Sequence, residues 1–85
     1  MIVAGDFNAA IESPALLALA NSFEDGFATV GLGAGDPERA SCGPQRIDHL
    51  LTRGLHALEC SVDRGAGDAS DHLPVVATFE PERWP

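Results

Sequence analysis

The chain has 85 residues and no lysine, so its five basic residues are all arginines. Thirteen aspartates and glutamates outweigh them and leave a formal net charge of −8 at pH 7. Binding to a phosphate backbone depends on neutralising cations, so this chain alone is a poor candidate for gripping long nucleic acid. Carboxylates are also the ligands that hard divalent cations prefer. The acidic balance therefore fits a divalent metal site.

Cysteine is also scarce, with only Cys42 and Cys60 and no C-x-x-C pattern. This excludes a disulfide scaffold and a zinc ribbon, and we expect two free thiols in a cytoplasmic protein. The first residues, Met-Ile-Val-Ala-Gly-Asp, lack the basic segment of a secretory signal peptide. No apolar run approaches the length of a membrane span.

Length allows one small domain, and a hydrophobic content of 45% predicts that it is folded. We assign residues 1–80 to this domain and residues 81–85 to an exposed tail. An apolar strand is expected at residues 2–4, buried and ending in a loop that carries Asp6 and Asn8. Because a strand rarely begins at the initiator methionine, we expect the chain to be cut from something longer.

Helical spacing follows a serine cap at Ser13 and a proline at the first helical position, Pro14. The pattern predicts a helix over residues 14–23 with one apolar face buried. Phe23 and Phe27 are expected to pack in the core. The apolar positions of this pattern are Leu16, Leu17, Ala20, Phe23 and Phe27.

Residues 31–45 are rich in glycine and proline but do not match G-x-G-x-x-G, so we predict a connecting loop. Strands are expected over residues 47–52, 55–62 and 75–79. Arg53-Gly54 is short enough to join the first two as a hairpin. Alternation places His49 on the side of its strand opposite to Asp48, as a packed or surface histidine. The element order β-α-β-β-β predicts an α/β fold.

Three polar motifs lie at the ends of predicted strands: Gly-Asp-Phe-Asn at residues 5–8, Arg-Ile-Asp-His at 46–49, and Ser-Asp-His-Leu-Pro-Val at 70–75. A carboxylate on one imidazole nitrogen holds a histidine in a single tautomer and orientation. Further carboxylates suit Mg²⁺, and an asparagine amide suits a phosphate oxygen. Together these groups favour hydrolysis of a phosphate ester by an in-line water.

In this order the three motifs resemble the C-terminal motifs of the endonuclease/exonuclease/phosphatase superfamily. The resemblance implies half of a four-layer α/β sandwich, with a mixed β-sheet and one main helix. It also implies that Asp6 aligns or deprotonates the attacking water, Asn8 holds the phosphate, and Asp48 pairs with His72. His72 would contact the scissile phosphate, and Asp71, with Asp6, would bind Mg²⁺ or Mn²⁺.

Complete members of that superfamily are much longer, and their first half carries the principal metal-binding glutamate. The resemblance therefore implies a partial phosphoesterase domain that needs a second copy or a separate first half to cover its sheet. The substrate would be a phosphate ester: nucleic acid, a nucleotide, an inositol phosphate or a lipid head group. One alternative is a non-catalytic module that interacts or self-assembles through the exposed sheet. The other is a transition-metal site, although no tight zinc spacing joins its ligands His49, His56, Cys60 and His72.

Overall fold

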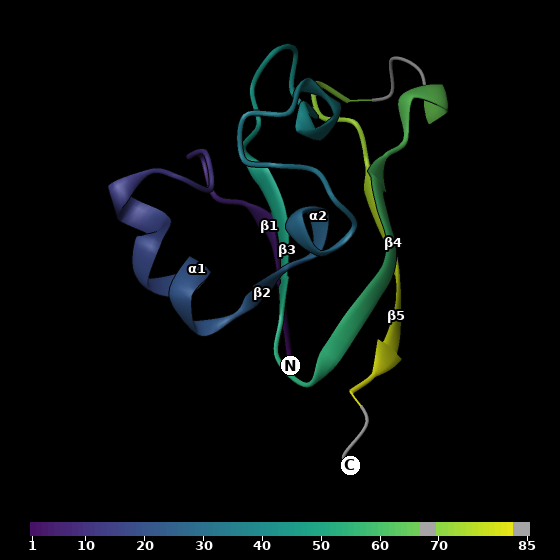
Figure 1. The fold of residues 1–85 in the computed structure, drawn as a ribbon. Coiled ribbons are helices and arrows are strands. Elements are labelled where there is room, and N and C mark those ends of the chain that lie inside the picture. The colour runs from purple at the N-terminus through teal and green to yellow at the C-terminus, as the bar shows by residue number, and fades with distance from the viewer. Residues whose placement is uncertain (67–69, 83–85) are drawn as a thin grey trace.

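The computed structural model describes residues 1–66 and 70–82, which form two antiparallel sheets and several short helices (Figure 1). The α/β class with one main helix is confirmed, and the arrangement is that of a partial α/β sandwich. The four-residue helix α2 (Gly26–Thr29) contacts a strand of each sheet. It thereby joins the two sheets into one body.

The first sheet has the order β1-β3-β2, formed by β1 (Ile2–Asp6), β3 (Asp48–Thr52) and the short β2 (Glu24–Asp25). Leu51 is fully buried, and Val3 opposite it packs against the same apolar cluster. The prediction of a buried first strand was wrong, because Ile2 and Ala4 are exposed. β1 lies at the edge of the sheet, and only the Val3 side of the strand packs against that cluster.

The predicted helix is present but begins with a 3₁₀ turn, Pro14–Leu16, before the α-helix α1 (Leu17–Ser22). Pro14 occupies the first helical position as expected, whereas the Ser13 side chain makes no cap hydrogen bond. Leu16 is buried, but Leu17 is 55% exposed, contrary to prediction. A 3₁₀ turn has three residues per turn instead of 3.6, so it rotates the following side chains away from the expected face.

Phe23 and Phe27 pack into separate clusters. Phe23 joins the first, centred on Ile11, Leu16 and Leu51. Phe27 is fully buried in α2 and packs with Cys60 and other apolar residues of the second sheet. The intervening strand β2 redirects the chain, so the helical periodicity does not extend from one phenylalanine to the other.

The second sheet pairs β4 (Leu55–Val62) with β5 (Val75–Pro81). The hairpin considered for β3 and β4 is not formed: the chain turns at Gly54, with φ of 81°, and passes from one sheet to the other. This turn lets the buried side of β4, with Cys60 and Val62, pack against Phe27. In Figure 1 the two sheets diverge from this turn with α2 between them.

The predicted loop at 31–45 is confirmed as an irregular segment interrupted by a 3₁₀ turn, Pro37–Arg39. Another 3₁₀ turn, Arg64–Ala66, follows β4. β5 extends two residues further than expected, and residues 67–69 of the predicted second loop and 83–85 of the predicted tail lie outside the described residues. None of the helices in the described part of the chain is long and apolar enough to cross a membrane.

Candidate active site

Asp6 and Asp48 lie directly opposite each other where β1 ends and β3 begins. Opposed residues of an antiparallel pair project to the same face of the sheet. The two carboxylates therefore share a face with Ala4 and Leu50. Asp6 remains accessible, with 48% of its side chain exposed, and its Oδ1 accepts a hydrogen bond of 2.7 Å from the backbone N–H of Asn8.

His72 reaches this face from the segment that precedes β5. Its Nδ1 lies 2.6 Å from Oδ2 of Asp48, and its Nε2 lies 3.5 Å from Oδ2 of Asp6. The backbone N–H of His72 donates to the Ser70 hydroxyl, and that of Leu73 donates to the carbonyl oxygen of Ser41. These backbone contacts fix the position of the imidazole between the two carboxylates.

The hydrogen bond to Asp48 raises the pKa of His72 above its ordinary value, because it stabilises the imidazolium. Partial burial opposes this shift, while the negative charges of Asp48, Asp6 and Asp71 add to it. A protonated His72 has two N–H donors. With Nδ1 directed at Asp48, the second donor, Nε2, is on the Asp6 side.

Asn8, in the motif at residues 5–8, and Asp71, in the motif at residues 70–75, are both exposed. Asn8 has a φ of 52°, in the left-handed region, where asparagine is enriched among non-glycine residues. Its backbone hydrogen bond to Asp6 closes a turn typical of aspartate. Asp71 adjoins His72 but is not in the group of potential metal ligands found among the described residues.

An open cavity of about 560 Å³ adjoins these side chains. The cavity is lined by the polar side chains of Asp6, Asp48 and His72 and by apolar groups of both sheets, so a ligand here would contact charged and apolar surface together. Its lining residues are Ala4, Gly5, Asp6, Asp48, His49, Leu50, His72, Leu73, Pro74 and Val75.

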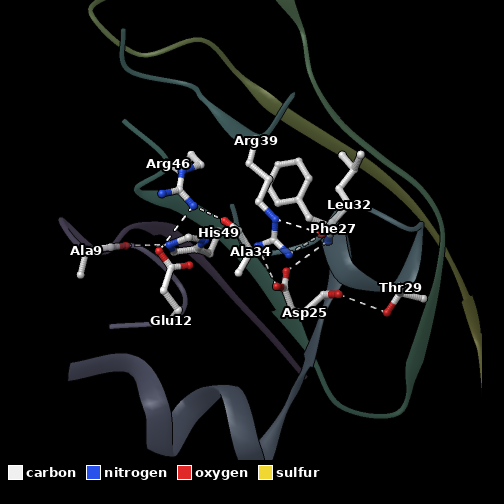
Figure 2. A network of polar contacts seen from close by, with 10 residues as sticks. All are labelled: Ala9, Glu12, Asp25, Phe27, Thr29, Leu32, Ala34, Arg39, Arg46 and His49. Carbon is white, nitrogen blue, oxygen red and sulfur yellow. Dashed lines mark hydrogen bonds and ion pairs between the residues drawn. The ribbon is translucent and has the colours of Figure 1, made fainter. Parts of the chain in front are cut away.

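His49 is 2% exposed, and its side chain is directed away from Asp48, as alternation predicted. Nε2 of His49 lies 2.8 Å from the carbonyl oxygen of Ala9 (Figure 2). The centroid of the His49 ring lies 5.5 Å from that of the Phe7 ring. Of the two positions expected for His49, packed or at the surface, the structure shows the packed one.

A family model described as the endonuclease/exonuclease/phosphatase family matches residues 1–72, which is most of the chain. The chain belongs to this family. No curated protein and no solved structure matches it significantly. The matched region includes residues 5–8 and 46–49 and reaches His72, so all three strand-end motifs contribute residues to it. Membership supports a hydrolase of the phosphoesterase or nuclease type.

The donor set formed by Asp6, Asp48 and His72 fits a hard divalent cation. Ligand atoms of Asp6, Asp48 and His72 lie within 4.8 Å of one another, and two of the three residues are carboxylates. Oδ2 of Asp48 already accepts two hydrogen bonds, so the more accessible carboxylate of Asp6 is the better oxygen ligand. Within the described residues the alternative zinc ligands are not gathered: Cys60 packs in the second cluster and His49 against Ala9.

Two buried polar residues were not expected from the sequence, and one of them, Ser41, contacts the site. Ser41 is 1% exposed, and its hydroxyl donates to Oδ2 of Asp48 at 2.5 Å. Arg39, also 1% exposed, pairs with Asp25 at 2.8 Å and donates to the carbonyl oxygen of Leu32 (Figure 2). Both lie in the loop of residues 31–45, where no periodicity marks a buried side chain.

Proposed function

We propose that this chain carries the catalytic residues of a divalent-metal-dependent phosphoesterase that hydrolyses its substrate by in-line attack of water. The observation that supports this most is the placement of His72 between Asp48 and Asp6, three residues from three separate segments of the chain. A histidine oriented by a largely buried carboxylate and facing a more accessible one suits charge stabilisation at a phosphoryl group.

Asp48 acts as the orienting carboxylate in this proposal. It is 13% exposed and receives Nδ1 of His72, so the imidazole presents Nε2 toward the accessible side. Because the pKa of His72 is raised, the imidazolium form is favoured, and its Nε2–H donates to an oxygen of the scissile phosphate. His72 thereby stabilises the negative charge that develops in the transition state.

Asp6 aligns or deprotonates the attacking water, since its side chain is more accessible than that of Asp48. Asn8, two residues further, holds a phosphate oxygen with its side-chain amide. The turn between these two residues is closed by the hydrogen bond from the Asn8 N–H to Asp6. That hydrogen bond keeps the Asp6 carboxylate, which would act on the attacking water, close to Asn8, which would bind the phosphate.

Asp6 and Asp71 would hold Mg²⁺ or Mn²⁺. Both carboxylates are exposed, as needed for a cation that retains several waters. The bound metal would polarise a phosphate oxygen and offset the charge of the ester. These two ligands would leave Oδ2 of Asp48 to its hydrogen bonds with Ser41 and His72.

The substrate is a phosphate ester, drawn from nucleic acids, nucleotides, inositol phosphates or lipid head groups. The apolar wall of the cavity and the exposed Ile2 and Ala4 of β1 favour a covering partner on this face. A second copy or a separate first half of the domain would supply it and complete the metal site.

Hydrolysis of an activated aryl phosphodiester by the purified chain, with and without Mg²⁺, tests this function. We expect metal-dependent turnover that is lost in His72→Ala and retained in His56→Ala, where an exposed histidine of β4 is removed. The absence of turnover in the unsubstituted chain, or equal turnover in His72→Ala, would overturn the proposal for this chain.

A non-catalytic interaction module is the second candidate, favoured by half-exposed apolar side chains on three strands. Ile2, Leu58 and Val76 are each 51% exposed. If these surfaces assemble copies of the chain, the native mass will exceed the 8.9 kDa of the monomer. Sedimentation equilibrium, combined with the hydrolysis assay, separates an inactive assembly from an active one.

A further inference from the structure

We propose that Ser41 is a positioning residue that holds both members of the Asp48–His72 pair. Its hydroxyl donates to Oδ2 of Asp48 at 2.5 Å, the same oxygen that faces Nδ1 of His72. Ser41 is 1% exposed and lies outside the three motifs from which the active site was inferred. The role of this contact rests on the proposed function, but its geometry does not.

The backbone of Ser41 contacts the other member of the pair. Its carbonyl oxygen accepts a hydrogen bond of 2.7 Å from the N–H of Leu73, the residue after His72. One residue therefore binds the carboxylate through its side chain and the histidine-bearing segment through its backbone. Displacement of Ser41 would shift both partners relative to each other.

The loop around Ser41 is itself fixed by buried or bridging polar contacts. Arg39 donates to the carbonyl oxygen of Leu32 and pairs with Asp25 (Figure 2), and Arg64 donates to the carbonyl oxygen of Ala40 at 3.0 Å. The N–H of Ser41 donates to the carbonyl oxygen of Gln45. Ser41 is thus held from both sides, as a positioning residue must be.

The Ser41 hydroxyl fixes the orientation of the Asp48 carboxylate. The terminal torsion of aspartate is broad, so a carboxylate with a single partner is free to rotate. Two donors on Oδ2, Ser41 and His72, saturate that oxygen and define the plane of the group. Without the Ser41 donor, Asp48 rotates and the geometry of the His72 hydrogen bond is lost.

The hydrogen bond can be observed without turnover, through the proton NMR resonance of Nδ1–H in His72. We expect a downfield resonance in the unsubstituted chain, absent in His72→Gln, and shifted upfield or lost to exchange in Ser41→Ala. Ser41→Thr, which keeps a hydroxyl, should retain it. Ser61→Ala, which removes an exposed serine of β4, should leave it unchanged.

Ser41→Cys provides a second variant of similar shape whose thiol is a weak donor, and amide spectra establish that each variant is folded. Loss or an upfield shift of the resonance in a folded Ser41→Ala chain supports the proposal, and an unchanged resonance in that chain overturns it. Ser41→Cys decides in the same way if Ser41→Ala does not fold. If the unsubstituted chain is active, the same variants should lower kcat about 10-fold with little change in KM.

The two proposals fail in different ways. An inactive chain whose Nδ1–H resonance still depends on the Ser41 hydroxyl would overturn the proposed function and leave the positioning role in place. An active chain that needs His72 but keeps both its kcat and its resonance in Ser41→Ala would overturn the positioning role alone.

Discussion

Nδ1 of His72 and Oδ2 of Asp48 lie 2.6 Å apart, although the two residues are separated by 24 positions in the chain. This distance is short even for a charge-assisted hydrogen bond. Between the two residues the chain completes β3, crosses to the second sheet and runs the length of β4. The contact therefore reports on whether the two sheets are correctly placed.

The His72 contact makes stability depend on pH. Because the folded-state pKa of His72 is raised, its contribution is fully present below the unfolded pKa of 6.5 and is lost as pH rises through the folded pKa. We expect the free energy of unfolding of the unsubstituted chain to exceed that of His72→Gln by more at about pH 5.5 than at about pH 9. Urea unfolding of both proteins measures this. A difference that stays constant or grows with pH would contradict it.

Breaking the Arg39–Asp25 pair should be costly, because its side chains are only 2% and 11% exposed. Arg39→Met leaves a buried carboxylate without its cation and the carbonyl oxygen of Leu32 without its donor. We expect a loss of about 3 kcal/mol or more in the free energy of unfolding, measured by urea denaturation.

The matched control for Arg39 is the double variant Arg39→Met/Asp25→Asn, which removes the charge and keeps an acceptor for the Phe27 N–H. It should recover part of the lost stability. Equal stability of the two variants would mean that the loss arises from the volume of Arg39 and not from the unpaired charge.

The proximity of Asp6, Asp48 and His72 could be predicted in part from the sequence, because short apolar runs mark the strands: Asp6 ends β1, Asp48 begins β3, and His72 lies in the segment just before β5. Their chemical roles stay predictions. The burial of Ser41 could not be predicted from the sequence, because a serine in a glycine- and proline-rich loop has the pattern of an exposed turn. Only tertiary contacts bury it.

The pairing of the strands was less accessible from sequence. A two-residue connection between alternating segments favours a hairpin, yet β3 and β4 belong to different sheets. Their buried side chains need different partners: Leu51 packs in the first cluster with Ile11 and Leu16, whereas Cys60 packs with Phe27. Local periodicity shows which side of a strand is buried but not against which element.

Gly26 should be sensitive to a single added methyl group. A Cβ at this position would lie 3.2 Å from both Sγ of Cys60 and the carbonyl oxygen of Leu50, in a buried contact between α2 and the two sheets. We expect Gly26→Ala to lower the free energy of unfolding by about 1–3 kcal/mol. Gly33→Ala is the control, since a Cβ there meets no atom within 4 Å. Equal effects of the two substitutions in thermal unfolding would argue against close packing at Gly26.

The two thiols should differ in reactivity while the chain is folded. Cys60 is 5% exposed, and burial, reinforced by the charge of Asp25, raises its pKa to about 11 although Arg39 opposes the shift. Near pH 8 only about a thousandth of such a thiol is thiolate, the reactive form. Cys42 is more accessible, so iodoacetamide should alkylate Cys42 first and reach Cys60 mainly when the chain unfolds.

Peptide mapping can separate the two thiols directly, because Arg46 and Arg53 lie between them and trypsin cleaves after both. Native alkylation should label the peptide of Cys42 well before that of Cys60, and addition of urea should bring the two rates together. Arg39→Met removes the cation that opposes the raised pKa of Cys60, which by itself slows labelling, so faster labelling of Cys60 in this variant would report loosened packing around the thiol. If both peptides are labelled at one rate in the native protein, then α2 does not cover the Cys60 side chain, and the cluster of Phe27, Cys60 and Val62 is not closely packed.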